Sequence, residues 1–160
     1  MNTGQSLMSI GALLLLSLAS LQFNSVILEN NTAEIENKVY LTAFSLADDL
    51  IEEIKQKAFD ERTIDFQAIN VNQLTYPPDK EGGEVWPYFD DIDDYNNYVK
   101  PVSLPHVEDY TVTSTVNYCT TNGNDIYTQS YYKKVTIKVT SKYMRSPLYL
   151  KFIFSLHSKN

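Results

Sequence analysis

The sequence predicts an α+β protein in which one long N-terminal helix packs on a C-terminal antiparallel sheet. Three observations support this fold class. Residues 1–28 contain no charged side chain, residues 35–54 repeat apolar side chains at helical spacing, and residues 110–156 alternate apolar and polar side chains as half-buried strands do. A length of 160 residues with 43% hydrophobic and 21% charged side chains is ordinary for one globular domain.

Charge is distributed unevenly along the chain. The formal net charge is −7, but residues 29–109 hold 19 acidic and 6 basic side chains, whereas residues 110–160 hold 1 and 7. The overall acidity argues against a protein that binds polyanions, so no nucleic-acid partner is implied. The single cysteine, Cys119, cannot form a disulfide within the chain.

The N-terminal helix is expected to have two different halves. The apolar run Leu7–Leu28 has 22 residues, and a helix of that length is about 33 Å long, enough to cross a hydrocarbon core of about 30 Å. Beyond it a helical stripe continues, and no Pro or Gly after Gly11 interrupts the pattern. We therefore predict one helix from about Ser6 to about Lys57, with a transmembrane part at 5–28 and an amphipathic part at 29–58. The stripe consists of Ile35, Val39, Ala43, Leu46, Leu50 and Ile54, widened by Phe44, Ile51 and Ala58.

Two other interpretations of the N-terminal segment stay open. A cleaved secretory signal begins with basic residues and has a shorter apolar run, but here no Lys or Arg precedes the run. A plain N-terminal anchor also fits the composition. Neither flank carries a basic cluster, so the positive-inside rule does not orient the segment.

The start of the chain resembles the type IV pilin and pseudopilin superfamily. Residues 1–4 look like a short prepilin leader that ends in Gly4, and Leu46–Lys55 followed by Phe59–Glu61 is similar to the helix end of minor pilins. The resemblance implies cleavage between Gly4 and Gln5 by a prepilin peptidase, and methylation of the new N-terminus. The run Phe89–Tyr95 is also similar to a loop of pilin-like proteins.

The sequence departs from the family pattern near its start. Most pilins carry a glutamate five residues into the mature chain, whereas that position, counted from Gln5, is Ser9 here. The leader also lacks the usual lysines. These departures favour a minor, tip or divergent subunit over a standard major pilin.

The remainder of the globular part (29–160) is expected to hold a loop region at 59–105 and a sheet at 106–158. Predicted strands cover Tyr110–Tyr118, Tyr131–Ser141 and Leu148–Leu156, with a turn at Asn122–Asp125. Val102 and Leu104, between two prolines, indicate an extended edge. In the second strand the pattern places Val135, Ile137 and Val139 on one face.

The sequence offers no plausible catalytic set, so we expect no enzyme. His106 and His157 belong to no metal-spacing motif, and Cys119 is expected to be a small packed side chain rather than a nucleophile. One polar cluster is a candidate for Ca²⁺, because carboxylate oxygens are the ligands this ion prefers, although the spacing is not that of an EF-hand. The alternative is a solvated acidic loop. The cluster consists of Asp90, Asp91, Asp93 and Asp94.

The expected function is that of a structural filament subunit. The protein would sit in the inner membrane by a single pass, with its globular domain in the periplasm or outside the cell. Expected partners are other pilin-like subunits, the prepilin peptidase and an inner-membrane assembly platform, within a pilus or a type II secretion-like filament. The alternative is a permanently tethered periplasmic or surface domain that binds a ligand and does not polymerise. Subunit contacts are assigned to Leu7, Ser9, Leu13, Leu14, Leu16 and Leu18.

Overall fold

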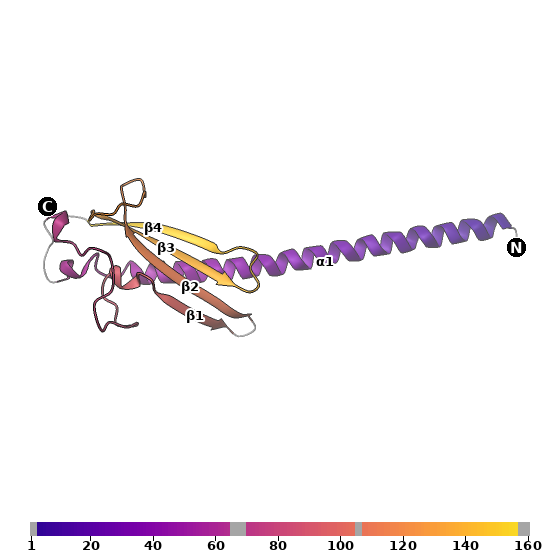
Figure 1. Cartoon of the computed structure of the whole chain (residues 1–160). Coiled ribbons are helices and arrows are strands. Elements are labelled where there is room, and N and C mark those ends of the chain that lie inside the picture. Colours follow the sequence, from indigo (N-terminus) through magenta and orange to yellow (C-terminus); the bar gives the residue numbers. More distant parts are fainter. Residues whose placement is uncertain (1–2, 65–69, 105–106, 157–160) are drawn as a thin grey trace. The chain divides into compact units, whose positions relative to one another are not determined.

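The chain forms one long helix and one four-stranded sheet, the predicted α+β arrangement (Figure 1). The structure is a computed structural model that describes residues 3–64, 70–104 and 107–156. It divides into two compact units, residues 1–39 and residues 40–160, which are described separately. The elements are α1 (Thr3–Ile54), the 3-10 turns η1 (Glu61–Thr63), η2 (Val71–Gln73) and η3 (Asp93–Tyr95), and the strands β1 (Val99–Leu104), β2 (Val107–Tyr118), β3 (Tyr132–Ser141) and β4 (Leu148–Ser155).

The described part of the first unit, residues 3–39, is helical throughout. Its large apolar side chains are exposed: Leu13 is 63%, Leu16 is 67% and Phe23 is 71% accessible. By length and composition, α1 can cross a membrane. The hydroxyl groups of Ser9 and Ser17 donate to the carbonyl oxygens of Gln5 and Leu13, at 2.9 and 2.8 Å. These polar side chains are therefore satisfied within the helix.

The second unit is built on an antiparallel sheet whose strands lie side by side in chain order, β1-β2-β3-β4. The register pairs Val112 with Val139 and Val135 with Phe152. The predicted alternation in β3 is confirmed, because every second residue from Lys133 to Val139 is buried. The extended edge expected near Val102 is a fourth strand, β1. It contains Pro101, which an edge strand tolerates since it needs no ladder N–H there.

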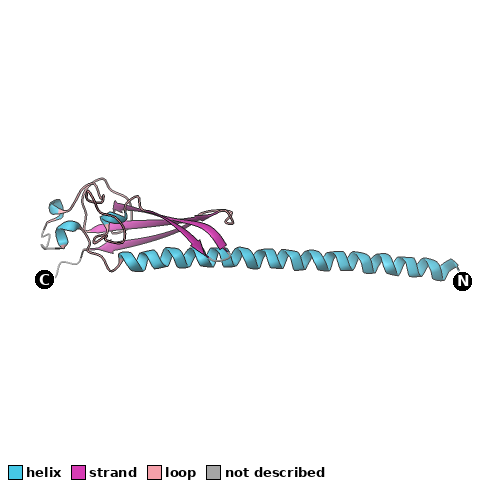
Figure 2. Ribbon diagram, turned by 90° about the horizontal axis from the view of Figure 1, so that it is seen from below, coloured by secondary structure: helices cyan, strands magenta, loops and turns pink. Residues whose placement is uncertain are grey.

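One face of this sheet is covered by the part of α1 that belongs to the second unit (Figure 2). Ala43 and Ala47 are fully buried there, and these small side chains permit a close approach of helix and sheet. Phe44, which was expected to widen the buried stripe, is 49% exposed instead. Leu50, Ile51 and Ile54 are also buried in this part of the helix. The buried apolar residues of the sheet include Val112, Val116, Val135, Ile137 and Val139.

The helix ends at Ile54, three residues before the predicted end at Lys57. Its last turn tightens into i→i−3 bonds, in which the amides of Gln56 and Lys57 donate to Glu53 and Ile54 at 3.2 and 3.0 Å. The amide of Ala58 donates instead to the carbonyl of Asp90, at 2.9 Å. A tertiary hydrogen bond therefore replaces the helical one where the helix stops.

The buried face of β3 should dominate the stability of the second unit. We expect Ile137→Ala to lower the free energy of unfolding by about 2–5 kcal/mol, because the deletion leaves a cavity beneath a fully buried position. Thr136→Ala, on the opposite face of the same strand, should cost less than about 1 kcal/mol. Urea unfolding of the full chain in detergent micelles, followed by circular dichroism, measures both. Equal losses would contradict the assignment of faces.

Candidate metal centre

The candidate site begins where the chain leaves the helix and meets the segment before β1. The amide of Ala58 donates to Asp90, and the amide of Ile92 donates back to the carbonyl of Ala58 at 3.0 Å, which makes a short parallel bridge. This bridge brings Asp60 and Glu61 beside Asp90 to Asp94, although about thirty residues separate them in sequence.

Two aspartates of the predicted cluster shape the segment that carries them. Oδ1 of Asp91 accepts a hydrogen bond from the amide of Asp94 at 3.1 Å, next to the start of η3. Oδ2 of Asp94 accepts from the amides of Asp90 and Asp91, at 2.9 and 3.3 Å. Short acidic side chains are favoured at turns because they can bond their own backbone in this way. Asp91 is fully buried, Asp94 is 1% exposed, and Asp90 lies at the surface.

Asp93 has a different partner, the buried Lys133 of β3. The Lys133 Nζ lies 2.7 Å from Oδ1 of Asp93 and 2.9 Å from Oδ2 of Asp60, and all three side chains are fully buried. The same Nζ donates to the carbonyl of Phe59 at 2.7 Å and stands 4.7 Å from the centre of the Phe59 ring. The ammonium group therefore donates to Phe59 and Asp60 and forms an ion pair with Asp93.

Asp60 connects this ion pair to the neighbouring loop. Its carboxylate accepts hydrogen bonds from the amide of Arg62 at 3.2 Å and from the amide of Thr75 at 3.0 Å, and the hydroxyl of Tyr118 lies 3.2 Å away. Burial alone would raise the pKa of Asp60, but the Lys133 ammonium and these hydrogen bonds lower it below the usual value. Asp60 is therefore held as a carboxylate.

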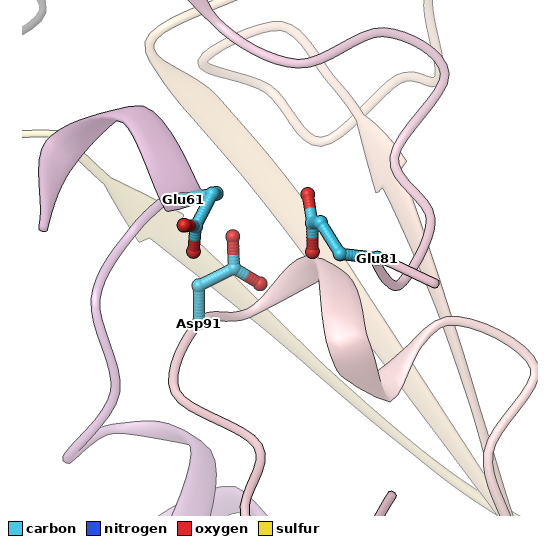
Figure 3. A group of neighbouring side chains, drawn as sticks. All are labelled: Glu61, Glu81 and Asp91. Carbon is cyan, nitrogen blue, oxygen red and sulfur yellow. The ribbon is translucent and has the colours of Figure 1, made fainter. Parts of the chain in front are cut away.

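The other acidic side chains converge on a common space. Ligand oxygens of Glu61, Glu81 and Asp91 lie within 4.8 Å of one another (Figure 3). Two further sets, Glu61 with Glu84 and Asp90, and Glu81 with Glu84 and Asp94, meet the same distance limit. The three sets share members, so six carboxyl groups from three segments form one cluster.

This cluster concentrates negative charge in a partly buried place. Burial, opposed by Lys133 and reinforced by Asp94 and Glu81, raises the pKa of Asp91 to about 7. Contact with the carboxyl of Asp94, together with burial and the charges of Asp94, Asp90 and Glu81, raises the pKa of Glu84 to about 8. Burial also raises the pKa of Asp93 to about 8, despite its contact with Lys133. A positive charge in this space would favour the ionised form of these carboxyl groups and would oppose the effect of burial on their pKa values.

The structure brings together only part of the aspartate cluster that the sequence singled out. Asp90, Asp91 and Asp94 join Glu61, Glu81 and Glu84, whereas Asp93 pairs with Lys133. Sequence reasoning missed all three glutamates and Lys133. A signal for Lys133 was present, because it shares the alternating register of Val135 and Ile137. Nothing local in the sequence connects Glu61 or Glu81 to Asp91. Metal binding stays a prediction.

The remaining predicted site residues lie elsewhere. Gly4 and Gln5 belong to α1, as do the assembly residues Leu7, Ser9, Leu13, Leu14, Leu16 and Leu18, and cleavage after Gly4 stays a prediction. Cys119 is fully buried directly after β2, and burial raises the pKa of its thiol, as expected for a packed side chain. His106 and His157, and Met1 and Asn2 of the proposed leader, lie outside the described residues.

Comparison with known proteins gives no match: no protein-family model, no curated protein and no solved structure is similar to this chain. The class of protein that the structure itself defines is an α+β protein with one long N-terminal helix, apolar in its first part, and a four-stranded antiparallel sheet.

Lys133 offers a direct test of how the buried charges stabilise this region. We expect Lys133→Met to lower the free energy of unfolding by about 3–5 kcal/mol, because it leaves Asp60 and Asp93 buried without a cation. Adding Asp93→Asn to that variant should recover part of the loss. Urea unfolding of the full chain in micelles provides the measurement.

The control for this experiment is Lys138→Met, on the opposite face of β3, which should change the free energy of unfolding by about 0.5 kcal/mol or less. A Lys133→Met variant as stable as the wild type would show that the buried ion pairs contribute nothing.

Proposed function

We propose that this chain is a membrane-anchored, pilin-like structural subunit that assembles through its apolar N-terminal helix into a filament of the type IV pilus or type II secretion kind. The observation that supports this proposal is the surface of residues 3–28, where apolar side chains are exposed around the helix and no charged residue occurs before Glu29. Such a surface needs lipid or other apolar helices around it.

The same helix is suited to both environments. Its backbone groups bond within the helix, and the hydroxyls of Ser9 and Ser17 bond to carbonyls one turn earlier. Moving it from lipid into a bundle of similar helices therefore breaks no hydrogen bond, and van der Waals packing can replace lipid contact. A subunit can be stored in the membrane and then added to a filament without unfolding.

Charge in the globular part favours ordered contacts between neighbouring subunits. Residues 29–109 are strongly acidic and residues 110–160 are basic. A head-to-tail contact that repeats along a filament places an acidic surface of one copy against a basic surface of the next, which selects one register.

A second function, a permanently tethered surface or periplasmic domain, is favoured by one observation. Ser9 occupies the position where pilins carry a glutamate, and its hydroxyl is already bonded to Gln5. It offers no charge that a neighbouring N-terminal amine could recognise. This candidate keeps the membrane anchor and omits assembly.

The mature N-terminus separates the two functions. For a filament subunit we expect mass spectrometry of protein from its native host to find a chain that begins at Gln5. Gly4→Leu should abolish that processing, while Gly11→Leu should preserve it. A Cβ at either glycine meets no atom within 4 Å, so we expect the helix to accommodate both changes. An uncleaved Met1, or a start near Leu21, would contradict the filament proposal.

Imaging tests whether the protein enters a polymer. Tyr127 is 87% exposed, so Tyr127→Cys can be labelled with a maleimide dye while the buried Cys119 is protected. We expect the label on filaments that can be sheared from cells or isolated from the periplasm. The wild-type chain, treated identically, is the control for dye specificity. A label confined to the cell envelope, with none on filaments, would favour the permanently tethered domain.

A further inference from the structure

We propose that the six-carboxylate cluster is a calcium site, centred on Glu61, Glu81 and Asp91, with Glu84, Asp90 and Asp94 completing its surroundings. The calcium proposal does not rest on the filament function, because it is argued only from contacts among six residues of the second unit.

The strongest support is a buried carboxylate oxygen that has no partner. Asp91 is fully buried, and its Oδ1 is used by the amide of Asp94, but its Oδ2 has no hydrogen-bond partner among the described residues. Figure 3 shows this carboxylate directed toward those of Glu61 and Glu81. Oε2 of Glu81 is likewise buried and without a hydrogen bond in the described part of the chain. Leaving a buried carboxylate oxygen unsatisfied is costly unless a cation or a donor meets it.

The nearest buried protein cation does not fill this role. The Nζ of Lys133 donates to Asp60 and to the carbonyl of Phe59, and it lies 2.7 Å from Oδ1 of Asp93, so three oxygens already surround it. The lysine thus compensates charge at Asp60 and Asp93. An ion from solvent is the proposed source of positive charge for the carboxylates around Asp91.

The chemistry of the ligands selects calcium among common ions. All six side chains offer carboxylate oxygen, which excludes the nitrogen and sulfur ligation typical of zinc and copper sites. Oxygens bound to Ca²⁺ lie roughly 2.3–2.6 Å from the ion, so those on opposite sides of it are about 5 Å apart. The ligand oxygens of each set lie within 4.8 Å of one another, a separation that one such ion can bridge. Mg²⁺ binds at about 2.0–2.1 Å and retains several waters, so a cage of many carboxylates suits it poorly.

Calcium would fasten three segments that are separate in sequence. Glu61 follows the helix end, Glu81 and Glu84 flank the Gly82-Gly83 turn, and Asp90 to Asp94 lead into η3 and β1. The ion would add to the contacts that already join these segments, which include the bridge at Ala58 and the ion pairs of Lys133. A ligand that binds only the folded chain stabilises it by mass action, so calcium binding should appear as stability.

The test uses the full chain in detergent micelles, stripped of metal with EGTA. Equilibrium dialysis against CaCl₂ should show saturable binding, and thermal unfolding in 1 mM Ca²⁺ should occur about 5 °C or more above that in EGTA. The same concentration of Mg²⁺ should give a much smaller shift. No saturable binding up to 5 mM Ca²⁺, or an equal shift with Mg²⁺, would overturn the proposal.

Two variants locate the site. Asp91→Asn keeps the side-chain shape and the acceptor for the amide of Asp94, and should abolish both the binding and the thermal shift. Its metal-free form should be at least as stable as the wild type, since the amide can donate to the neighbouring carboxylates. Should Asp91→Asn fail to fold, Glu81→Gln, which is only half-buried, replaces it and should weaken binding at least tenfold.

Asp109→Asn is the matched control. It makes the same chemical change at an exposed aspartate of β2 that pairs with Lys142 and does not belong to the six-carboxylate cluster. It should bind calcium as the wild type does. Calcium binding that survives both Asp91→Asn and Glu81→Gln unchanged would place the ion elsewhere and refute the assignment.

Discussion

The globular unit depends on one buried cation. Lys133 reaches from β3 to the chain that follows the helix, through Phe59 and Asp60, and to the start of η3, through Asp93. No apolar side chain at this position could satisfy two carboxylates and a carbonyl oxygen together. The lysine therefore ties both the helix exit and the segment before β1 to the sheet, together with the bridge between Ala58 and Asp91 that joins the two segments to each other.

The acidic region is divided by this lysine into two parts with different roles. Asp60 and Asp93 are neutralised within the protein, and Tyr118 and Thr75 complete the hydrogen bonds of Asp60. Oδ2 of Asp91 and Oε2 of Glu81, by contrast, have no hydrogen-bond partner among the described residues. Neighbouring acidic residues can therefore have different roles. Asp60 and Asp93 pair with a lysine of the protein, whereas the cluster around Asp91 is the proposed place for a cation from solvent. The roles differ because the free energy of a buried charge depends on its immediate partner.

The N-terminal helix obeys a simpler constraint. Its apolar surface and internally bonded backbone require an apolar environment but do not distinguish lipid from neighbouring helices. Anchoring and assembly are therefore alternative uses of the same physical surface. Under the proposed processing after Gly4, the position at which a pilin carries a glutamate would be Ser9, whose hydroxyl bonds within its own helix.

The sequence by itself determined the elements whose cause is local. Uninterrupted apolar and helical spacing predicted α1 to within three residues at each end, and alternation predicted the buried faces of β2 and β3, because periodicity alone records which side of an element meets the core. It also indicated Asp90, Asp91 and Asp94 as acidic neighbours. Only the tertiary structure decided that Glu61, Glu81 and Glu84 lie beside these aspartates and that Asp93 instead pairs with Lys133. Those contacts depend on the bridge between Ala58 and Asp91, and residues distant in sequence leave no periodic pattern that would reveal their meeting.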